Sequence, residues 1–273
     1  MKTQYYIICF ILLCITCEAQ KTSFSSARVV YTFSHLRDTN NLGVVYQEKM
    51  MLDFNAAKSV YKSYSIFSMD SAMDQEMRKP GYDFNKPMVI PKASWEQYFN
   101  FFADNSCYLI RPWFGGKISI KDTTVIDWSI NAETKVIGGF TCNKATGNFA
   151  GRQYVAWYCP EIAVKAGPWK LHGLPGLILE ASDTKEQVKF ELQSLYNLND
   201  VSIELPNGAK PVSKKEFRKM EESFTQNPMA VINTMLGNGE NSNVSIAKTN
   251  GEGIPIKTPV KKNGFNNPLE LTD

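Results

Sequence analysis

The 273-residue sequence has few of the side chains on which catalysis and metal binding usually depend. It contains only two histidines, His35 and His172. Beyond residue 19 it lacks the patterns His-Glu-x-x-His, Cys-x-x-Cys and Gly-x-Ser-x-Gly. The common zinc, redox and nucleophile-elbow signatures are therefore missing. The sequence assigns no cofactor and no catalytic residue.

A strong charge bias and a long apolar run are also missing. The formal net charge is +3, and basic residues alternate with acidic ones along most of the chain. Nothing in this pattern calls for nucleic acid as a partner. After the N-terminal segment, no stretch approaches the ~18 consecutive apolar residues of a membrane helix. We therefore expect no transmembrane span once that segment is removed.

Residues 1–19 are typical of a secretory signal peptide. A lysine precedes an apolar run over residues 5–15, and small residues follow near the end of the segment. The run is too short for a typical membrane span, and its end resembles a cleavage site. We predict export to the periplasm or cell envelope, with a mature chain that begins near Gln20. A lipoprotein acylated at Cys17 is a weaker alternative, because residues 14–16 make a poor lipobox.

An apolar–polar alternation with a period of two dominates the rest of the chain. In the clearest case, Val188, Phe190 and Leu192 share one face, opposite Lys189 and Glu191. This pattern is typical of half-buried strands, and short strands joined by brief turns favour an antiparallel sheet. The same alternation recurs at residues 29–33, 46–54, 60–66, 118–120, 126–130 and 201–205.

Two segments have helical spacing instead. Over residues 94–102, aromatic side chains recur at i, i+3, i+4 and i+7 behind Ser94, a candidate N-cap. The second segment begins at Ser213, which can form a capping box with Glu216, and its apolar stripe ends at Phe224. We expect about two helices packed on the sheet.

These patterns predict a mainly β (α+β) fold, with a strongly curved, half-barrel-like antiparallel sheet. Residues 20–236 form the expected single β-rich domain. Residues 237–273 are rich in Gly, Asn, Ser, Lys and Pro, and we expect a largely disordered tail there. The architecture resembles that of periplasmic lipoprotein carriers, a likeness that assigns no function.

Residues 167–179 read Gly-Pro-Trp-Lys-Leu-His-Gly-Leu-Pro-Gly-Leu-Ile-Leu. The glycines and prolines predict a shaped, irregular loop that leads into a buried strand. The string at residues 173–178, together with the stretch from Ile137 onwards, resembles the GLPGLI family of exported proteins from Bacteroidetes-type bacteria. The resemblance implies an exported, envelope-associated protein. It brings no catalytic residues, because that family has no assigned chemistry.

A β-hairpin is predicted over residues 134–158. If residues 149–152 form its loop, Cys142 lies directly opposite Cys159. An exported chain meets an oxidising compartment, so we expect one disulfide, with 142–159 slightly favoured. Disulfides between adjacent strands are geometrically demanding, and Cys107 remains a competitor for either thiol.

Aromatic and polar side chains gather around the irregular loop. Such a mixture suits the capture of a ligand or peptide. The alternative is structural: the tryptophans pack the loop onto the sheet while Arg152 and Glu161 pair. The candidate ligand-binding residues are Arg152, Tyr154, Trp157, Glu161, Trp169 and His172.

Three functions remain open. The leading one is an exported, non-enzymatic envelope protein that binds a hydrophobic ligand, a peptide or a partner protein, in a role compatible with outer-membrane transport. The second is a thiol hydrolase or transferase that uses Cys159 and His172, with Asp183 as a third member. The third is copper binding by three methionines spaced by four residues, from Met69 to Met77.

Overall fold

The computed structural model describes residues 26–83, 89–113, 116–227 and 266–271. The described chain forms one twelve-stranded sheet with two helices, in the strand order β12-β6-β5-β4-β3-β2-β1-β11-β10-β9-β8-β7. The strands are β1 (Ser26–His35), β2 (Tyr46–Asn55), β3 (Lys58–Ser63), β4 (Gln97–Phe101), β5 (Ser106–Trp113), β6 (Gly116–Thr123), β7 (Trp128–Ile137), β8 (Phe140–Phe149), β9 (Arg152–Cys159), β10 (Leu177–Asp183), β11 (Val188–Asn197) and β12 (Ala209–Pro211). The helices are α1 (Tyr64–Met77) and α2 (Lys214–Gln226).

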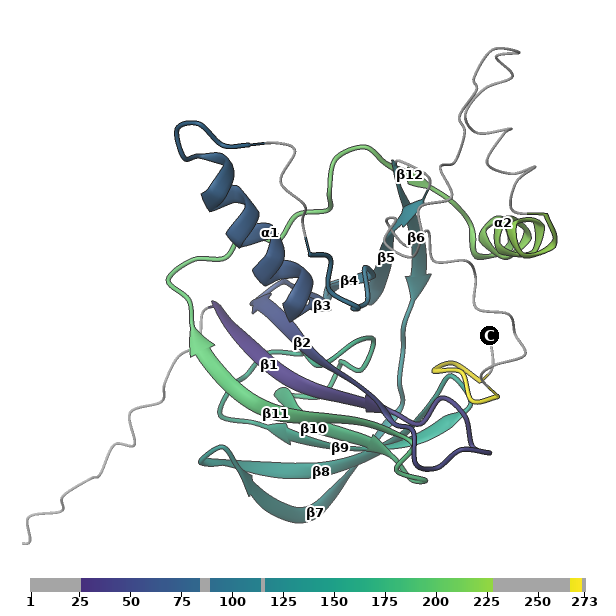
Figure 1. Cartoon of the computed structure of the whole chain (residues 1–273). Helices are drawn as coiled ribbons and strands as arrows, with labels where there is room; N and C mark the ends of the chain where they lie inside the picture. Colours follow the sequence, from purple (N-terminus) through teal and green to yellow (C-terminus); the bar gives the residue numbers. More distant parts are fainter. Residues whose placement is uncertain (1–25, 84–88, 114–115, 228–265, 272–273) are drawn as a thin grey trace, which may run out of the picture.

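The sheet is curved and does not close into a barrel (Figure 1). Its pairs are antiparallel except for the short β12, which runs parallel to β6. Helix α1 packs over β2 and β3, and α2 packs beside β6. The predicted mainly β fold with a curved sheet and two helices is confirmed.

At the centre of the sheet, the strands show the apolar–polar alternation that the sequence predicted. On β1, Val29, Tyr31 and Phe33 all lie in the main core. Phe33 pairs with Phe190 of β11, whose neighbour Val188 is also buried. One face of each central strand therefore contributes to a single continuous core.

The helix predicted over residues 94–102 is wrong, because residues 97–101 form β4. Tyr98 packs into the main core, whereas Phe99 packs on the opposite face with Val60 and Ile110. Both faces of the sheet are covered at this strand. Consecutive aromatic residues are therefore buried, which hides the period of two.

Two other segments differ from the predicted strands. The alternation after Val60 ends at Ser63, whose side chain accepts a hydrogen bond from the Ile66 amide and caps α1. Residues 201–205 pair with no strand in the described part of the chain, although Ile203 is buried. The capping box of Ser213 and Glu216 is confirmed at the start of α2.

The connection between β9 and β10, residues 160–176, packs against the inner face of the sheet. Trp169, which is 1% exposed, lies at its centre. Its ring contacts Tyr98 of β4, Phe149 of β8 and Phe190 of β11. Its backbone carbonyl accepts a hydrogen bond of 3.0 Å from the Asn100 side chain. The loop thus fills the space between strands that are far apart in the sheet.

A short C-terminal segment, residues 266–271, also packs against the domain. Asn267 is buried, its amide bonds the Arg37 carbonyl, and the Leu271 amide bonds the Ala150 carbonyl. The sequence analysis placed this segment in a disordered tail, most of which lies outside the described residues. The signal peptide at 1–19 lies outside them too. No helix in the described ranges is long and apolar enough to cross a membrane.

Candidate functional site

A cavity of about 380 Å³ lies on the inner face of the sheet, and we call it the aromatic cavity. Its strand lining comes from alternate residues, such as Tyr46, Glu48 and Met50 of β2, because i and i+2 share a face. Loop residues and residues 267–269 of the C-terminal segment supply the rest of the wall. The other lining residues are Phe33, His35, Arg37, Tyr61, Ser94, Glu96, Tyr98, Trp169, Phe190, Asn267, Pro268 and Leu269.

Four of the lining rings form a closed circuit, which we call the aromatic box. Its members are Tyr61, Tyr98, Trp169 and Phe190. Successive ring centroids are 6.5 Å apart from Tyr61 to Tyr98, 6.4 Å from Tyr98 to Trp169, 6.5 Å from Trp169 to Phe190, and 6.3 Å from Phe190 back to Tyr61. Four different elements of the chain supply these rings.

Two carboxylates border the aromatic rings. The Tyr46 hydroxyl donates to Glu48, and the Ser94 amide donates to the second oxygen of that carboxylate at 2.9 Å. The Tyr98 hydroxyl donates to Glu96 at 2.8 Å. The one arginine of the lining, Arg37, lies over the Tyr46 ring, 3.3 Å from its centroid.

Three buried polar atoms of the lining have no hydrogen-bond partner among the described residues: Nε2 of His35, the hydroxyl of Tyr61 and Nε1 of Trp169. The side chains are 5%, 2% and 1% exposed, respectively. Burial, with help from the charges of Arg152 and Arg37, lowers the pKa of His35 to about 4. The imidazole is therefore neutral near pH 7. Its other nitrogen bonds the Asn267 backbone, which leaves Nε2 as an acceptor.

Of the six ligand-binding candidates named from the sequence, only Trp169 lines the aromatic cavity. Arg152 is buried and bonds Asp183 at 2.7 Å, and it also donates to Asn267 Oδ1 and to the Pro268 carbonyl, each at 2.6 Å. It thus holds the C-terminal segment in place. The expected pairing of Arg152 with Glu161 is wrong, since Glu161 is exposed and Arg152 bonds Asp183.

The other candidates lie apart from the cavity lining. Tyr154 is fully buried in the core. Trp157 is half-buried, and its ring centroid lies 5.6 Å from the Lys135 ammonium and 5.9 Å from that of Lys144. His172 is buried beside the Phe102 ring. The sequence analysis missed the lining residues on β1 to β4. Their only signal was an aromatic residue at alternate strand positions, which also describes an ordinary core.

The thiol triad is not assembled in the described chain. Asp183 is occupied by Arg152 and by the amides of Gln187 and Val188. Cys159 is hydrogen-bonded to the neighbouring Cys142 thiol, and this hydrogen bond lowers the pKa of Cys159 to about 7. The pKa of His172 falls to about 4 through burial alone.

The predicted hairpin register is confirmed, since Asn148 pairs with Gln153. The loop is shorter than the expected residues 149–152, because Phe149 and Arg152 also pair. Cys142 and Cys159 are both buried, and here they are free thiols, as is Cys107. The geometry brings the favoured pair together. The 142–159 bond itself stays a prediction.

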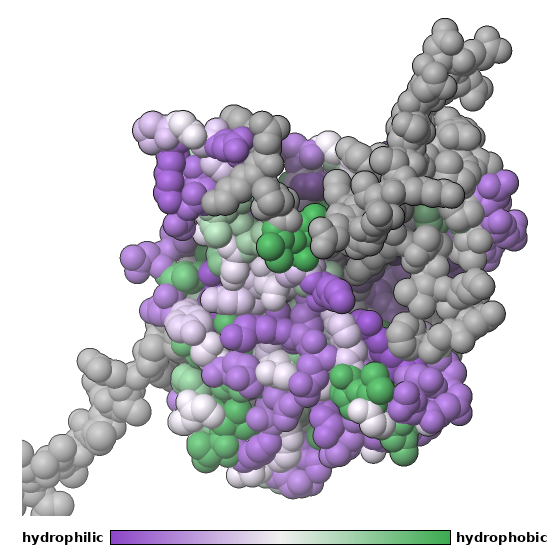
Figure 2. Space-filling view, viewed as in Figure 1, coloured by the Kyte–Doolittle hydropathy of each residue, from purple (hydrophilic) through white to green (hydrophobic). Residues whose placement is uncertain are grey.

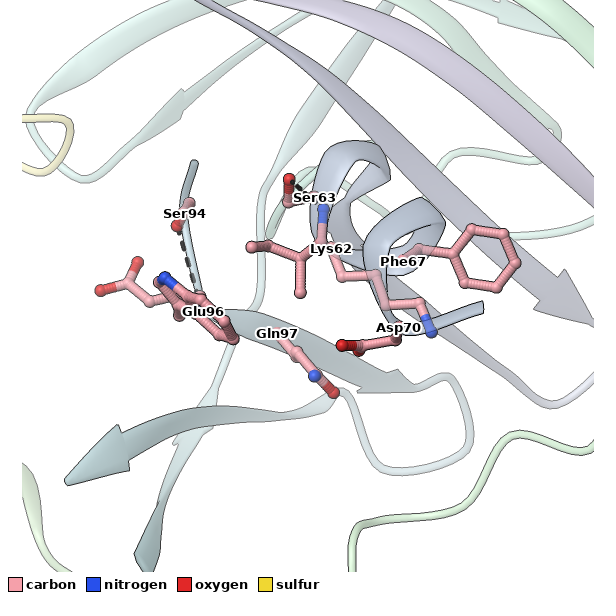
Figure 3. A pocket seen from close by; sticks show the side chains of 9 residues that line it. Lys62, Ser63, Phe67, Asp70, Ser94, Glu96 and Gln97 are labelled. Carbon is pink, nitrogen blue, oxygen red and sulfur yellow. Dashed lines mark hydrogen bonds between the residues drawn. The ribbon is translucent and has the colours of Figure 1, made fainter. Parts of the chain in front are cut away.

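A second, much smaller hollow lies beside α1 (Figure 3), with a volume of about 30 Å³. Lys62 and Asp70 both line it, and burial lowers the pKa of Lys62 and raises that of Asp70. Its size suits about one water molecule. The methionines considered for copper lie on the same helix, and Met77 is exposed at its end.

Comparison with known proteins adds a family match and a fold. Residues 149–180 match the model of a family described as a protein of unknown function (Porph_ging), a stretch that includes the loop at 173–178. No curated protein matches the chain.

The solved structure of PNGF-II in space group P21 is similar, with a TM-score of 0.53 and 16% identity over 71% of this chain and 32% of that one. In space group C2 the values are 0.49, 18%, 69% and 31%. The chain thus spans about a third of PNGF-II, and the similarity shows the fold alone.

Proposed function

We propose that this chain is an exported, non-catalytic envelope protein that holds a small, largely apolar ligand in the aromatic cavity. The observation that carries the proposal is a cavity with aromatic walls in which His35 Nε2, the Tyr61 hydroxyl and Trp169 Nε1 lack hydrogen-bond partners among the described residues. A buried polar group without a hydrogen bond costs ~1–3 kcal/mol, so a ligand that supplies the missing bonds would recover this free energy.

The cavity has the character of a small-molecule site. Its volume of about 380 Å³ lies towards the lower end of the ~300–1,000 Å³ usual for such sites, and its few polar groups stand among hydrophobic ones. The face of the molecule in Figure 2 is mainly hydrophilic, with hydrophobic residues in separate groups. These features favour an enclosed small ligand over a partner protein docked on that face. The signal-like segment at 1–19 supports export.

Native mass spectrometry of protein purified gently from its own host envelope tests this proposal. We expect a bound small molecule on the wild-type chain. Met50→Phe would place a larger side chain in the cavity lining and abolish the adduct, whereas Met77→Phe, an identical change on exposed α1, would keep it. Urea midpoints of both variants check that they remain folded. A wild-type chain without any adduct, or an adduct that survives in Met50→Phe, would refute the proposal.

A further inference from the structure

We infer that the ligand of the aromatic cavity is an organic cation: an alkylammonium group carried on a compact apolar body. This inference rests on the proposed function and names the chemical class of its ligand. The aromatic box, two carboxylates and a neutral histidine acceptor converge on one cavity. Each of these features attracts positive charge or N–H donors, and they come from separate parts of the chain.

The aromatic box has dimensions suited to a cation. Its successive centroid separations lie between 6.3 and 6.5 Å. A group held near the middle of such a circuit lies within the ~6 Å over which a cation is attracted to a ring. Trp169 and the two tyrosines are the stronger cation-binding rings, and Phe190 completes the enclosure.

The cavity offers hydrogen-bond acceptors beside one donor that has no partner among the described residues, Nε1 of Trp169. His35 offers Nε2, because its other nitrogen is engaged by the Asn267 backbone. Glu48 and Glu96 add two negative charges to the lining, where Arg37 is the one basic residue, and Arg111 outside the lining lies 3.7 Å from Glu96. The Arg37 guanidinium lies over the outer ring of Tyr46, which is not part of the aromatic box. An ammonium group would therefore find acceptors and negative charge, whereas a carboxylate would meet two like charges.

Three probes with the same phenyl-ethyl type of body separate charge from shape: 2-phenylethylamine, 2-phenylethanol and phenylacetate. Isothermal titration calorimetry on the wild-type chain near neutral pH measures each affinity. We expect the ammonium to bind ~10-fold more tightly than the alcohol, the size of a desolvated cation–π contribution, and the carboxylate to bind most weakly. An alcohol or carboxylate that binds as tightly as the amine would overturn the inference and leave the proposed function intact. If none of the probes binds, both fail.

Charge-removal variants provide the second arm. Glu96→Gln keeps an oxygen that accepts from Tyr98 but removes a negative charge. We expect it to weaken amine binding ~5-fold without changing the affinity for the alcohol. The control Glu204→Gln removes a carboxylate from an exposed ion pair with Lys58, and neither affinity should change. An amine-to-alcohol ratio that is unchanged in both Glu96→Gln and Glu48→Gln would overturn the inference.

Discussion

Trp169 and Phe190 stack with their ring centroids 6.5 Å apart and their planes at 14°, although one lies in the β9–β10 loop and the other on β11. Trp169 adopts a left-handed backbone conformation, with φ of 56°. Such a conformation is uncommon for a large side chain and persists only where its surroundings require it. The stack therefore couples the shape of the loop to the wall of the aromatic cavity.

The close approach of Gly176 to β9 predicts a large effect of any side chain at this position. A Cβ there would lie 2.3 Å from the Cys159 carbonyl oxygen. We expect Gly176→Val to lower the free energy of unfolding by ~1–3 kcal/mol through overpacking, as a urea titration would measure. Backbone strain is not the cause, because Gly176 is not among the glycines with positive φ. Contact with the backbone of β9 is the reason.

Gly116→Val is the matched control, because a Cβ at Gly116 would have its nearest contact at 3.8 Å. The position lies at the start of β6, where a β-branched residue is favourable. Equal urea midpoints for the two variants would contradict the role assigned to Gly176.

The buried pair of Arg152 and Asp183 predicts a non-additive response to mutation. Arg152→Met leaves Asp183 charged, buried and without its 2.7 Å partner, so we expect a loss of ~3–5 kcal/mol in unfolding free energy. The double variant Arg152→Met with Asp183→Leu should lose less than the single variant, because no uncompensated charge remains. Chemical denaturation of the wild type, Arg152→Met, Asp183→Leu and the double variant completes the cycle, and strictly additive losses would rule the coupling out.

The C-terminal segment should respond to the same change. Arg152 donates to the Leu269 carbonyl at 3.1 Å as well as to Asn267 and Pro268. Without these bonds, limited proteolysis should cut within residues 266–271 faster than in the wild type. Arg78→Met, on an exposed position after α1, should leave the cleavage rate unchanged.

The two buried histidines predict a loss of stability in acid. The pKa of His35 and that of His172 are both lowered to about 4 from an ordinary value of 6.5. Because folding depresses the pKa of each, their contribution is fully present above pH 6.5 and is lost as the pH falls towards 4. Each histidine lowers the free energy of unfolding by on the order of 3 kcal/mol over this fall in pH.

Urea midpoints of the wild type and His172→Phe, measured at about pH 7.5 and about pH 4.5, test this dependence. The phenylalanine cannot titrate, and it removes a buried Nε2 that has no partner among the described residues. We expect a smaller fall in stability on acidification for the variant. The same fall in both proteins would contradict the prediction.

The register of the β8–β9 hairpin predicts the state of the cysteines in exported protein. Peptide mapping without reduction should recover a linked Cys142–Cys159 peptide, with Cys107 alkylated only after unfolding because all three are buried. A Cys107–Cys142 link with a rapidly alkylated Cys159 would refute the pairing. That result would also favour the hypothesis of a thiol hydrolase or transferase that uses Cys159.

The sequence by itself determined the elements in which local chemistry decides the structure. Alternation specified β1 and β11, whose core-facing side chains are apolar. The capping box specified the start of α2, and the loop expected at residues 149–152 specified the β8–β9 register. Each of these features lies within a few neighbouring residues, and local sequence determines such features well.

The tertiary structure alone decided β4 and the aromatic cavity. Burial on both faces turned a helical pattern at residues 97–101 into a strand, and only the neighbouring elements determine which faces are buried. The aromatic box joins Tyr61 to Tyr98, Trp169 and Phe190, which are distant in sequence. Strand order and the path of one loop bring them together. A cavity forms where such distant side chains leave a space between them, and no local sequence pattern predicts that space.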